Sequence, residues 1–139
     1  MTHSRPIKFR AWDKNLNKME KRWPGIECFE MVGLNGGDRF IVMQFTGLHD
    51  KNGKEIYEGD IVIHPDTYTE TVDVGIGNVP VAQTEENTIA EVVFEKGAFG
   101  INVTGNTESL YKGFNPFSET ELEEIEIIGN IYENPELLK

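Results

Sequence analysis

The feature that most constrains this chain is the spacing of its apolar residues, which follow a period of two from one end to the other. A period of two lines one face of a strand, whereas an amphipathic helix needs a period of about 3.6. With no long segment of helical period, the sequence predicts a mainly β fold class, a small SH3-like barrel or roll. The expected strands cover residues 7–11, 40–45, 60–63, 71–74, 89–95, 99–103 and 125–132.

Two of these strands carry a more specific expectation. In the first, Ile7, Phe9 and Ala11 alternate with Lys8, Arg10 and Trp12, which is typical of a strand with one buried face. The strand ending at Ile63 is expected to stop at Pro65, because proline has no N–H to donate to a sheet. Residues 65–88 are rich in Thr, Glu, Gly and Asn, so we predict an extended or mobile insertion within a single domain spanning residues 1–139.

The central turns are the clearest local signals. Asp50-Lys51-Asn52-Gly53 is strong turn chemistry, because Asn and Gly tolerate positive φ and an Asp side chain can accept hydrogen bonds from the following backbone. Glu58-Gly59-Asp60 marks a second tight turn before an apolar strand, and Gly129 is assigned the same structural role near the end of the chain. We therefore interpret Asp50, Asn52, Gly53, Gly59, Asp60 and Gly129 as structural turn residues.

The carboxylates and the amide around these turns also raise the alternative of a cation site, since Ca²⁺ and Mg²⁺ prefer oxygen ligands. The spacing of a calcium-binding loop is not met, because Gly53 follows Asn52 at once and Ile61 stands at the twelfth position, where that loop needs Glu. The structural interpretation is favoured, and we expect neither a metal nor a cofactor.

Two further segments depart from the alternation. Residues 14–23 place Leu16, Met19 and Trp23 at helical spacing, but the run is too short to separate a helical turn from an extended loop. Near the end, Asn134 can cap a short helix that begins at Pro135. Leu137 and Leu138 would then face an apolar surface, either of this core or of a neighbouring subunit.

Charge is unevenly distributed along the chain. Residues 1–60 carry 10 Lys/Arg and 9 Asp/Glu, whereas residues 61–139 carry 3 and 15, for a net charge of −11. This balance disfavours general affinity for nucleic acid. The basic N-terminal segment has two interpretations: it complements the acidic half, within the fold or between copies, or it contacts nucleic acid through Lys8 and Arg10 with Trp12 as a stacking platform. The first interpretation is favoured.

Nucleophilic and metal chemistry find little support. Cys28 is the only cysteine, which excludes a disulfide within the chain, and its acidic neighbours favour an inert thiol. His3, His49 and His64 are far apart in sequence, and no nucleophile motif lies near them. We expect a protein that is not an enzyme, without a signal peptide or membrane span, in the cytoplasm of its host.

Three motifs in order carry a resemblance to a known family. They are Lys8-Phe9-Arg10-Ala11-Trp12-Asp13, the run from Met43 through Gly47 and Gly53 to Val62, and residues 128–138 from Ile128-Gly129-Asn130 to Leu138. Together they resemble the YopX-like proteins of bacteriophages and prophages. The resemblance implies a small, mainly β, self-associating protein of phage or prophage origin, and it carries no catalytic residue with it.

The leading hypothesis is an accessory protein that acts through protein contacts as a homo-oligomer, with a host or phage protein as a further partner and no membrane partner. The alternative is a nucleic-acid-binding or regulatory module that uses the basic N-terminal segment. A metal-dependent hydrolase is a third hypothesis, which depends only on the crowded carboxylates. The candidate interaction surface comprises Lys8, Arg10, Trp12, Phe114, Phe117, Leu137 and Leu138.

Overall fold

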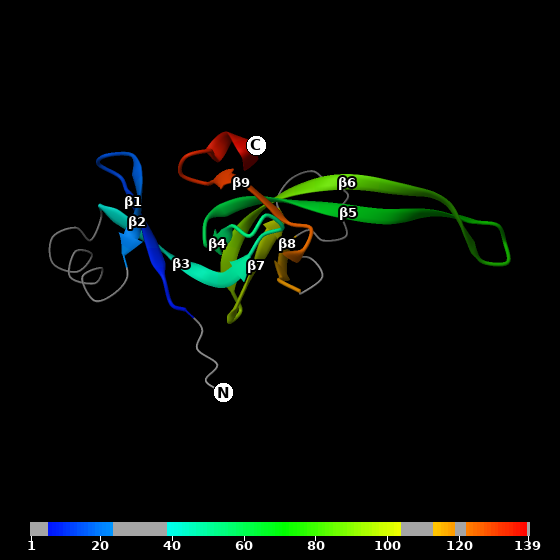
Figure 1. Ribbon diagram of the computed structural model, residues 1–139. Coiled ribbons are helices and arrows are strands. Elements are labelled where there is room, and N and C mark those ends of the chain that lie inside the picture. The colour runs from blue at the N-terminus through cyan, green and yellow to red at the C-terminus, as the bar shows by residue number, and fades with distance from the viewer. Residues whose placement is uncertain (1–5, 24–38, 104–112, 119–121, 139) are drawn as a thin grey trace, which may run out of the picture.

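The computed structural model describes residues 6–23, 39–103, 113–118 and 122–138, and it shows a mainly β protein, as predicted (Figure 1). One sheet has the strand order β2-β1-β3-β4 and the other has the order β8-β7-β6-β5-β9. All the neighbouring strands pair antiparallel. The strands are β1 (Phe9–Asp13), β2 (Lys18–Trp23), β3 (Phe40–His49), β4 (Glu55–Tyr57), β5 (Asp60–Asp73), β6 (Asn78–Glu95), β7 (Ala98–Val103), β8 (Gly113–Pro116) and β9 (Glu126–Asn130).

Strand β1 is covered on both faces, so the expectation of a single buried face is wrong. Ala11, Trp12 and Asp13 are all buried, and Arg10 is 7% exposed, whereas Ile7 is 66% exposed. The physical reason is that both faces have their own neighbours. Arg10 and Trp12 share one face, where Trp12 packs with Met19 and Met43 and Arg10 reaches Asp60 of the second sheet. Ala11 and Asp13 share the other face, where Asp13 pairs with Arg39.

The segment whose conformation the sequence left open is extended. Residues 14–17 form a turn with Asn17 in the left-handed region at φ 50°, and β2 follows. The resulting β1–β2 hairpin puts Leu16 and the lysines around it at the edge of the first sheet. The positions of Leu16 and Met19 therefore reflect a hairpin in which Met19 is buried and Leu16 is 62% exposed.

The long strand β3 is shared by two pairings. Residues Phe40 to Gln44 pair with β1, and Phe45 to His49 lie along β4. The β3–β4 connection contains the predicted Asp50–Gly53 turn, where Gly53 adopts φ 79°. Thr46 fixes the pair further, because its hydroxyl donates to the Ile56 carbonyl oxygen at 2.7 Å.

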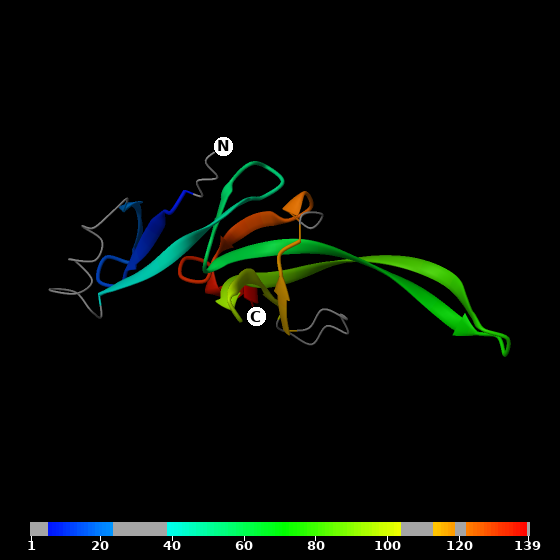
Figure 2. The ribbon, with the colours of Figure 1, turned by 90° about the horizontal axis from the view of Figure 1, so that it is seen from below.

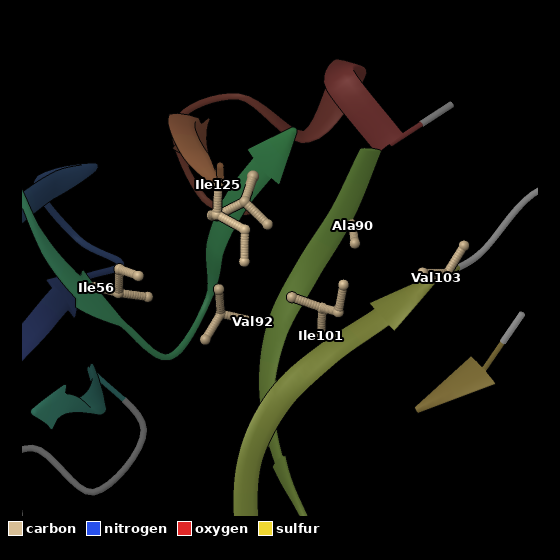
Figure 3. Close-up of a cluster of buried hydrophobic side chains, with 7 residues drawn as sticks. Ile56, Ala90, Val92, Ile101, Val103 and Ile125 are labelled. Atoms are coloured by element: carbon tan, nitrogen blue, oxygen red, sulfur yellow. The ribbon is translucent and has the colours of Figure 1, made fainter. Parts of the chain in front are cut away.

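The main core lies against the second sheet and draws on residues far apart in sequence (Figure 3). Its members are fully or almost fully buried aliphatic side chains, and Leu48, Phe117, Leu122 and Ile127 pack around them. The cluster consists of Ile56, Val62, Ala90, Val92, Ile101, Val103 and Ile125. Residues from β4, β5, β6, β7 and the segment before β9 therefore close one apolar interior.

Strands β5 and β6 continue well beyond this core as a two-stranded arm (Figures 1 and 2). Only Asp60 to Ile63 of β5 pair with β9, and only Ala90 to Glu95 of β6 pair with β7. The expectation that Pro65 ends the strand is wrong, since β5 runs through it to Asp73. Pro65 is tolerated because, among the described residues, the outer edge of β5 has no strand partner beyond Ile63.

The C-terminal segment ends in a short 3₁₀ helix, Pro135–Leu138, at the position where the sequence predicts a short helix. The helix packs against β6. Its residues Leu137 and Leu138 are half-buried, which places them partly against this chain's own sheet. Earlier in the chain, β8 pairs with β7, and Phe117 directly after β8 packs against the main core.

Candidate functional site

A buried ion pair joins the two sheets. Arg10 Nη2 on β1 donates to Asp60 Oδ1 at 2.8 Å, and it also donates to the Glu58 carbonyl oxygen at 3.1 Å. The second carboxylate oxygen of Asp60 accepts the backbone N–H of Tyr57 at 2.8 Å. The Arg10 guanidinium lies over the Tyr57 ring, 4.8 Å from its centroid. Arg10 thus holds the tight turn before β5 against the first sheet.

The surroundings of this pair shift two titrations. Burial raises the pKa of Asp60 above its ordinary value, and the neighbouring Arg10 opposes part of that rise. Burial also raises the pKa of Tyr57 to about 12, and the nearby Glu55 carboxylate adds to the effect. Both groups have hydrogen-bond partners within the protein. Asp60 accepts from Arg10 and from the Tyr57 N–H, and Tyr57 Oη donates to Glu55 Oε2 at 3.1 Å. The arrangement is that of a structural junction, with Gly59 at φ 82° between its two acidic neighbours.

The structure places most of the candidate interaction residues inside or against the protein. Trp12 is 8% exposed and stacks on Tyr132, with ring centroids 5.6 Å apart. Arg10 is paired as above, and the half-exposed Lys8 pairs with Glu55. Phe114 is half-buried in β8. The nucleic-acid alternative relied on Lys8, Arg10 and Trp12, and the structure leaves only Lys8 of these three accessible at the surface.

Asp50 organises the central turn through hydrogen bonds to backbone donors. Its Oδ1 accepts the N–H groups of Asn52 and Lys54, each at 2.9 Å, and its Oδ2 accepts the N–H of Ile127 at 3.1 Å. Although burial pushes the pKa of Asp50 upward, these three donors together bring it below its ordinary value. Among the residues that the structure describes, no group of His, Cys, Asp and Glu could hold a metal ion. Asp50 therefore has a turn-forming geometry that also ties the loop to β9.

We expect Asp50→Ala to lower the free energy of unfolding by about 2–3 kcal/mol, because it leaves three backbone N–H donors without the carboxylate that accepts them. Asp50→Asn keeps one acceptor oxygen and should cost roughly half as much. Urea denaturation followed by tryptophan fluorescence measures both variants. Equal stability of Asp50→Ala and the unmodified chain would contradict the assigned role.

The end of β9 is closed by two asparagines. Asn130 Oδ1 accepts the N–H groups of Tyr132 and Glu133, and Asn134 Oδ1 accepts the N–H of Asn130 at 3.3 Å. The Asn134 side chain thus points back to β9, while its backbone carbonyl accepts the N–H of Leu137. Gly129 lies within β9 instead of a turn, and a Cβ there would lie 2.5 Å from Asn134 Oδ1. A side chain at position 129 would displace this closure.

The arm carries the feature that sequence reasoning missed. Val72 of β5 lies directly opposite Val79 of β6, and a bulge between Glu70 and Thr71 leaves Val81 as an extra residue on β6. Val72 and Val79 therefore share one face of the arm, and Val74 just after β5 and Val81 at the bulge continue the same two-residue spacing; we call these four residues the valine face. These side chains are 44–58% exposed, and Ile76 at the tip is 98% exposed. The other face carries Thr71, Asp73, Asn78 and Pro80.

The signal for this face was present in the sequence as valines at every second position. Two facts that the sequence alone does not give make it significant, which are the strand register and the exposure of these side chains. A two-stranded ribbon with an apolar face is marginal by itself in water. Large apolar side chains gathered on a surface mark interaction sites. The valine face is therefore the candidate functional site of this chain.

No helix within residues 6–23, 39–103, 113–118 and 122–138 is long and apolar enough to cross a membrane. Cys28 and His3 lie outside the described residues. His49 packs edge-on against the Phe45 ring, and His64 is buried at the base of the arm. The structure thus separates these two histidines, one beside the central turn and one on β5.

Comparison with known proteins agrees with this fold. The structure is similar to the crystal structure of protein EF1440 from Enterococcus faecalis, with a TM-score of 0.58 and 24% sequence identity, covering 98% of this chain and 100% of that one. Identity at this level supports the fold alone. A search of curated proteins found no match. The YopX protein family matches residues 25–139, most of the chain, in agreement with the resemblance of the sequence motifs, and this chain therefore belongs to the YopX family.

Proposed function

We propose that this protein is a phage or prophage accessory protein that acts as a homo-oligomer through protein contacts and without catalysis, in the cytoplasm of the bacterial host. The observation that carries the proposal is the valine face, four partly exposed valines gathered around the Val72–Val79 pair of the arm. Ten residues separate Ile63 from Asp73, so the arm extends roughly 33 Å past its last pairing with β9. That reach is about twice the radius of gyration of a compact domain of this size, about 14 Å.

A second copy of the chain is the occupant that these features favour. An apolar face on a projecting ribbon gains free energy only when another surface covers it, at about 25 cal/mol per Å² of apolar area removed from water. The chain's own core lies at the base of the arm, beyond the reach of the tip valines (Figure 2). In a homo-oligomer every copy contributes one such face, so each arm can be covered by a neighbour.

Light scattering coupled to gel filtration tests this proposal. We expect the unmodified chain to elute with the mass of several chains, and Val72→Thr/Val79→Thr to shift the population toward the mass of one chain. Threonine retains the shape and the strand preference of valine but removes apolar area, so the arm itself should persist.

Thr71→Ser on the opposite face of the same arm is the matched control, and it should leave the mass unchanged. A single-chain mass for the unmodified protein at micromolar concentration would contradict the proposed function.

A further inference from the structure

We infer that the valine face docks on the β1–β2 hairpin of a second copy, so that copies associate head to tail. This inference rests on the proposed function, because it names the surface that the arm would meet in a homo-oligomer. The receiving surface, which we call the basic hairpin, consists of Lys14, Leu16, Lys18 and Lys21. All four side chains are exposed, and Leu16 is 62% exposed.

Charge complementarity selects this surface. Residues 64–89 of the arm carry five acidic residues and no Lys or Arg. Residues 14–21 carry three lysines and one glutamate. An acidic arm is therefore attracted to the basic hairpin and repelled by another arm, which would bring five acidic residues against five. Heterologous contact between arm and hairpin is favoured over contact between two arms.

Apolar chemistry matches as well. Leu16 projects from the hairpin turn among lysines, and the lysine side chains have apolar stems that can cover neighbouring valines while their ammonium groups stay in water. The valine face is the corresponding apolar centre, and Asp73 on the opposite face of the arm supplies acidic charge nearby. An apolar centre with a charged rim is the usual composition of a protein interface.

The two surfaces lie at opposite ends of the molecule. Both views show the β1–β2 hairpin at one end and the arm tip at the other, with the core between them (Figures 1 and 2). The valine face of one copy therefore cannot reach the basic hairpin of the same copy. A contact between different surfaces of identical copies is heterologous, and it generates a closed ring or an open filament. Each copy would contribute one arm and one hairpin.

Cysteine cross-linking tests which surfaces meet. In a Cys28→Ser background, Leu16→Cys/Val79→Cys should form a ladder of disulfide-linked chains on non-reducing gels after mild oxidation. Leu16→Cys alone and Val79→Cys alone should stay largely as single chains. A disulfide requires Cα atoms within about 7 Å, so the ladder reports direct contact between arm and hairpin. Leu16→Cys/Thr71→Cys, with its thiol on the opposite face of the arm, is the matched control and should link weakly.

Charge reversal gives a second readout. Lys14→Glu/Lys18→Glu should weaken association at least tenfold, and raising the salt concentration should weaken association of the unmodified chain, since screening acts on exposed charges. Lys96→Glu makes one charge reversal of the same kind at the exposed turn between β6 and β7 and should leave association unchanged.

The outcomes separate the two proposals. A single-chain mass for the unmodified protein overturns the proposed function and this inference together. A multimer that loses its mass in Val72→Thr/Val79→Thr but forms dimers with Val79→Cys alone means contact between two arms, and it overturns this inference only. A multimer that forms no ladder in Leu16→Cys/Val79→Cys also overturns this inference only.

Discussion

Replacing Arg10 with methionine is expected to lower the free energy of unfolding by about 3–5 kcal/mol, because Asp60 would remain buried without its cation. Asp60 is 3% exposed, and Arg10 donates to both Asp60 and the Glu58 carbonyl oxygen. Methionine retains much of the apolar volume of the arginine stem, so the loss reports mainly the charge and the hydrogen bonds. Urea denaturation of both proteins at pH 7 measures the difference.

The pH dependence of Arg10→Met distinguishes an uncompensated charge from a simple packing defect. Burial raises the pKa of Asp60 in the folded protein, and removal of Arg10 takes away the cation that opposes the rise. A carboxyl with a raised folded-state pKa binds its proton more tightly in the folded state, so acidification restores stability and rising pH removes it. The variant should therefore recover part of its loss as the pH falls from 7 toward 5.

Arg10→Lys is the matched control, since it keeps the charge but loses the planar group over Tyr57, and its loss should be intermediate. A cost below about 1 kcal/mol for Arg10→Met, in the range of exposed ion pairs, would show that the junction is not held by this pair.

Phe45→Ala is expected to cost about 3–5 kcal/mol, the range for removing a large buried aromatic side chain. Phe45 is 1% exposed and lies on β3 where its pairing passes from β1 to β4. Its ring centroid lies 5.4 Å from that of Tyr57 and 5.7 Å from that of His49, and Lys8 Nζ lies over the ring at 5.3 Å. The cavity would open at the meeting point of three strands. Thermal and urea denaturation measure the loss.

Phe94→Ala provides the matched comparison. Phe94 is 54% exposed and packs edge-on with Phe99, so its removal should cost well under half as much as that of Phe45. Phe45→Leu should fall between the two, because leucine refills part of the cavity. If Phe45→Ala and Phe94→Ala prove equally costly, the assignment of Phe45 to the structural centre is wrong.

The sequence predicts well those features that depend on neighbouring residues. The Asp50–Gly53 turn and most of the strands follow from local chemistry, and the structure has them. The hairpin turn between β6 and β7 follows the same local chemistry. Lys96 and Gly97 both have positive φ, 52° and 81°, as a two-residue hairpin turn requires. The mainly β class is also confirmed, because the alternation that predicts strands is a local pattern. The closer likeness to an SH3-like barrel remains a prediction.

Features that depend on distant partners were not predictable in this way. Arg10 has the sequence pattern of an exposed strand residue, but Asp60, 50 positions later, draws it into the interior. Pro65 has the pattern of a strand end, but the sheet edge beside it is free of a strand partner within the described residues. For the candidate site, the sequence showed the valines and the uneven charge. That the valine face and the basic hairpin lie at opposite ends of the molecule could be seen only from the register and the topology.

The composition of the main core has a consequence for how the chain matures during synthesis. Ile56 and Val62 emerge from the ribosome long before Ile125, and β9 supplies the outer neighbour of β5 at the base of the arm. The β5–β6 hairpin can zip locally as soon as its turn is made, because antiparallel neighbours need little loop closure. The interior stays open on one side until residue 130 or so has been translated, and over that interval the nascent chain presents unprotected aliphatic side chains to solvent and depends on rapid completion.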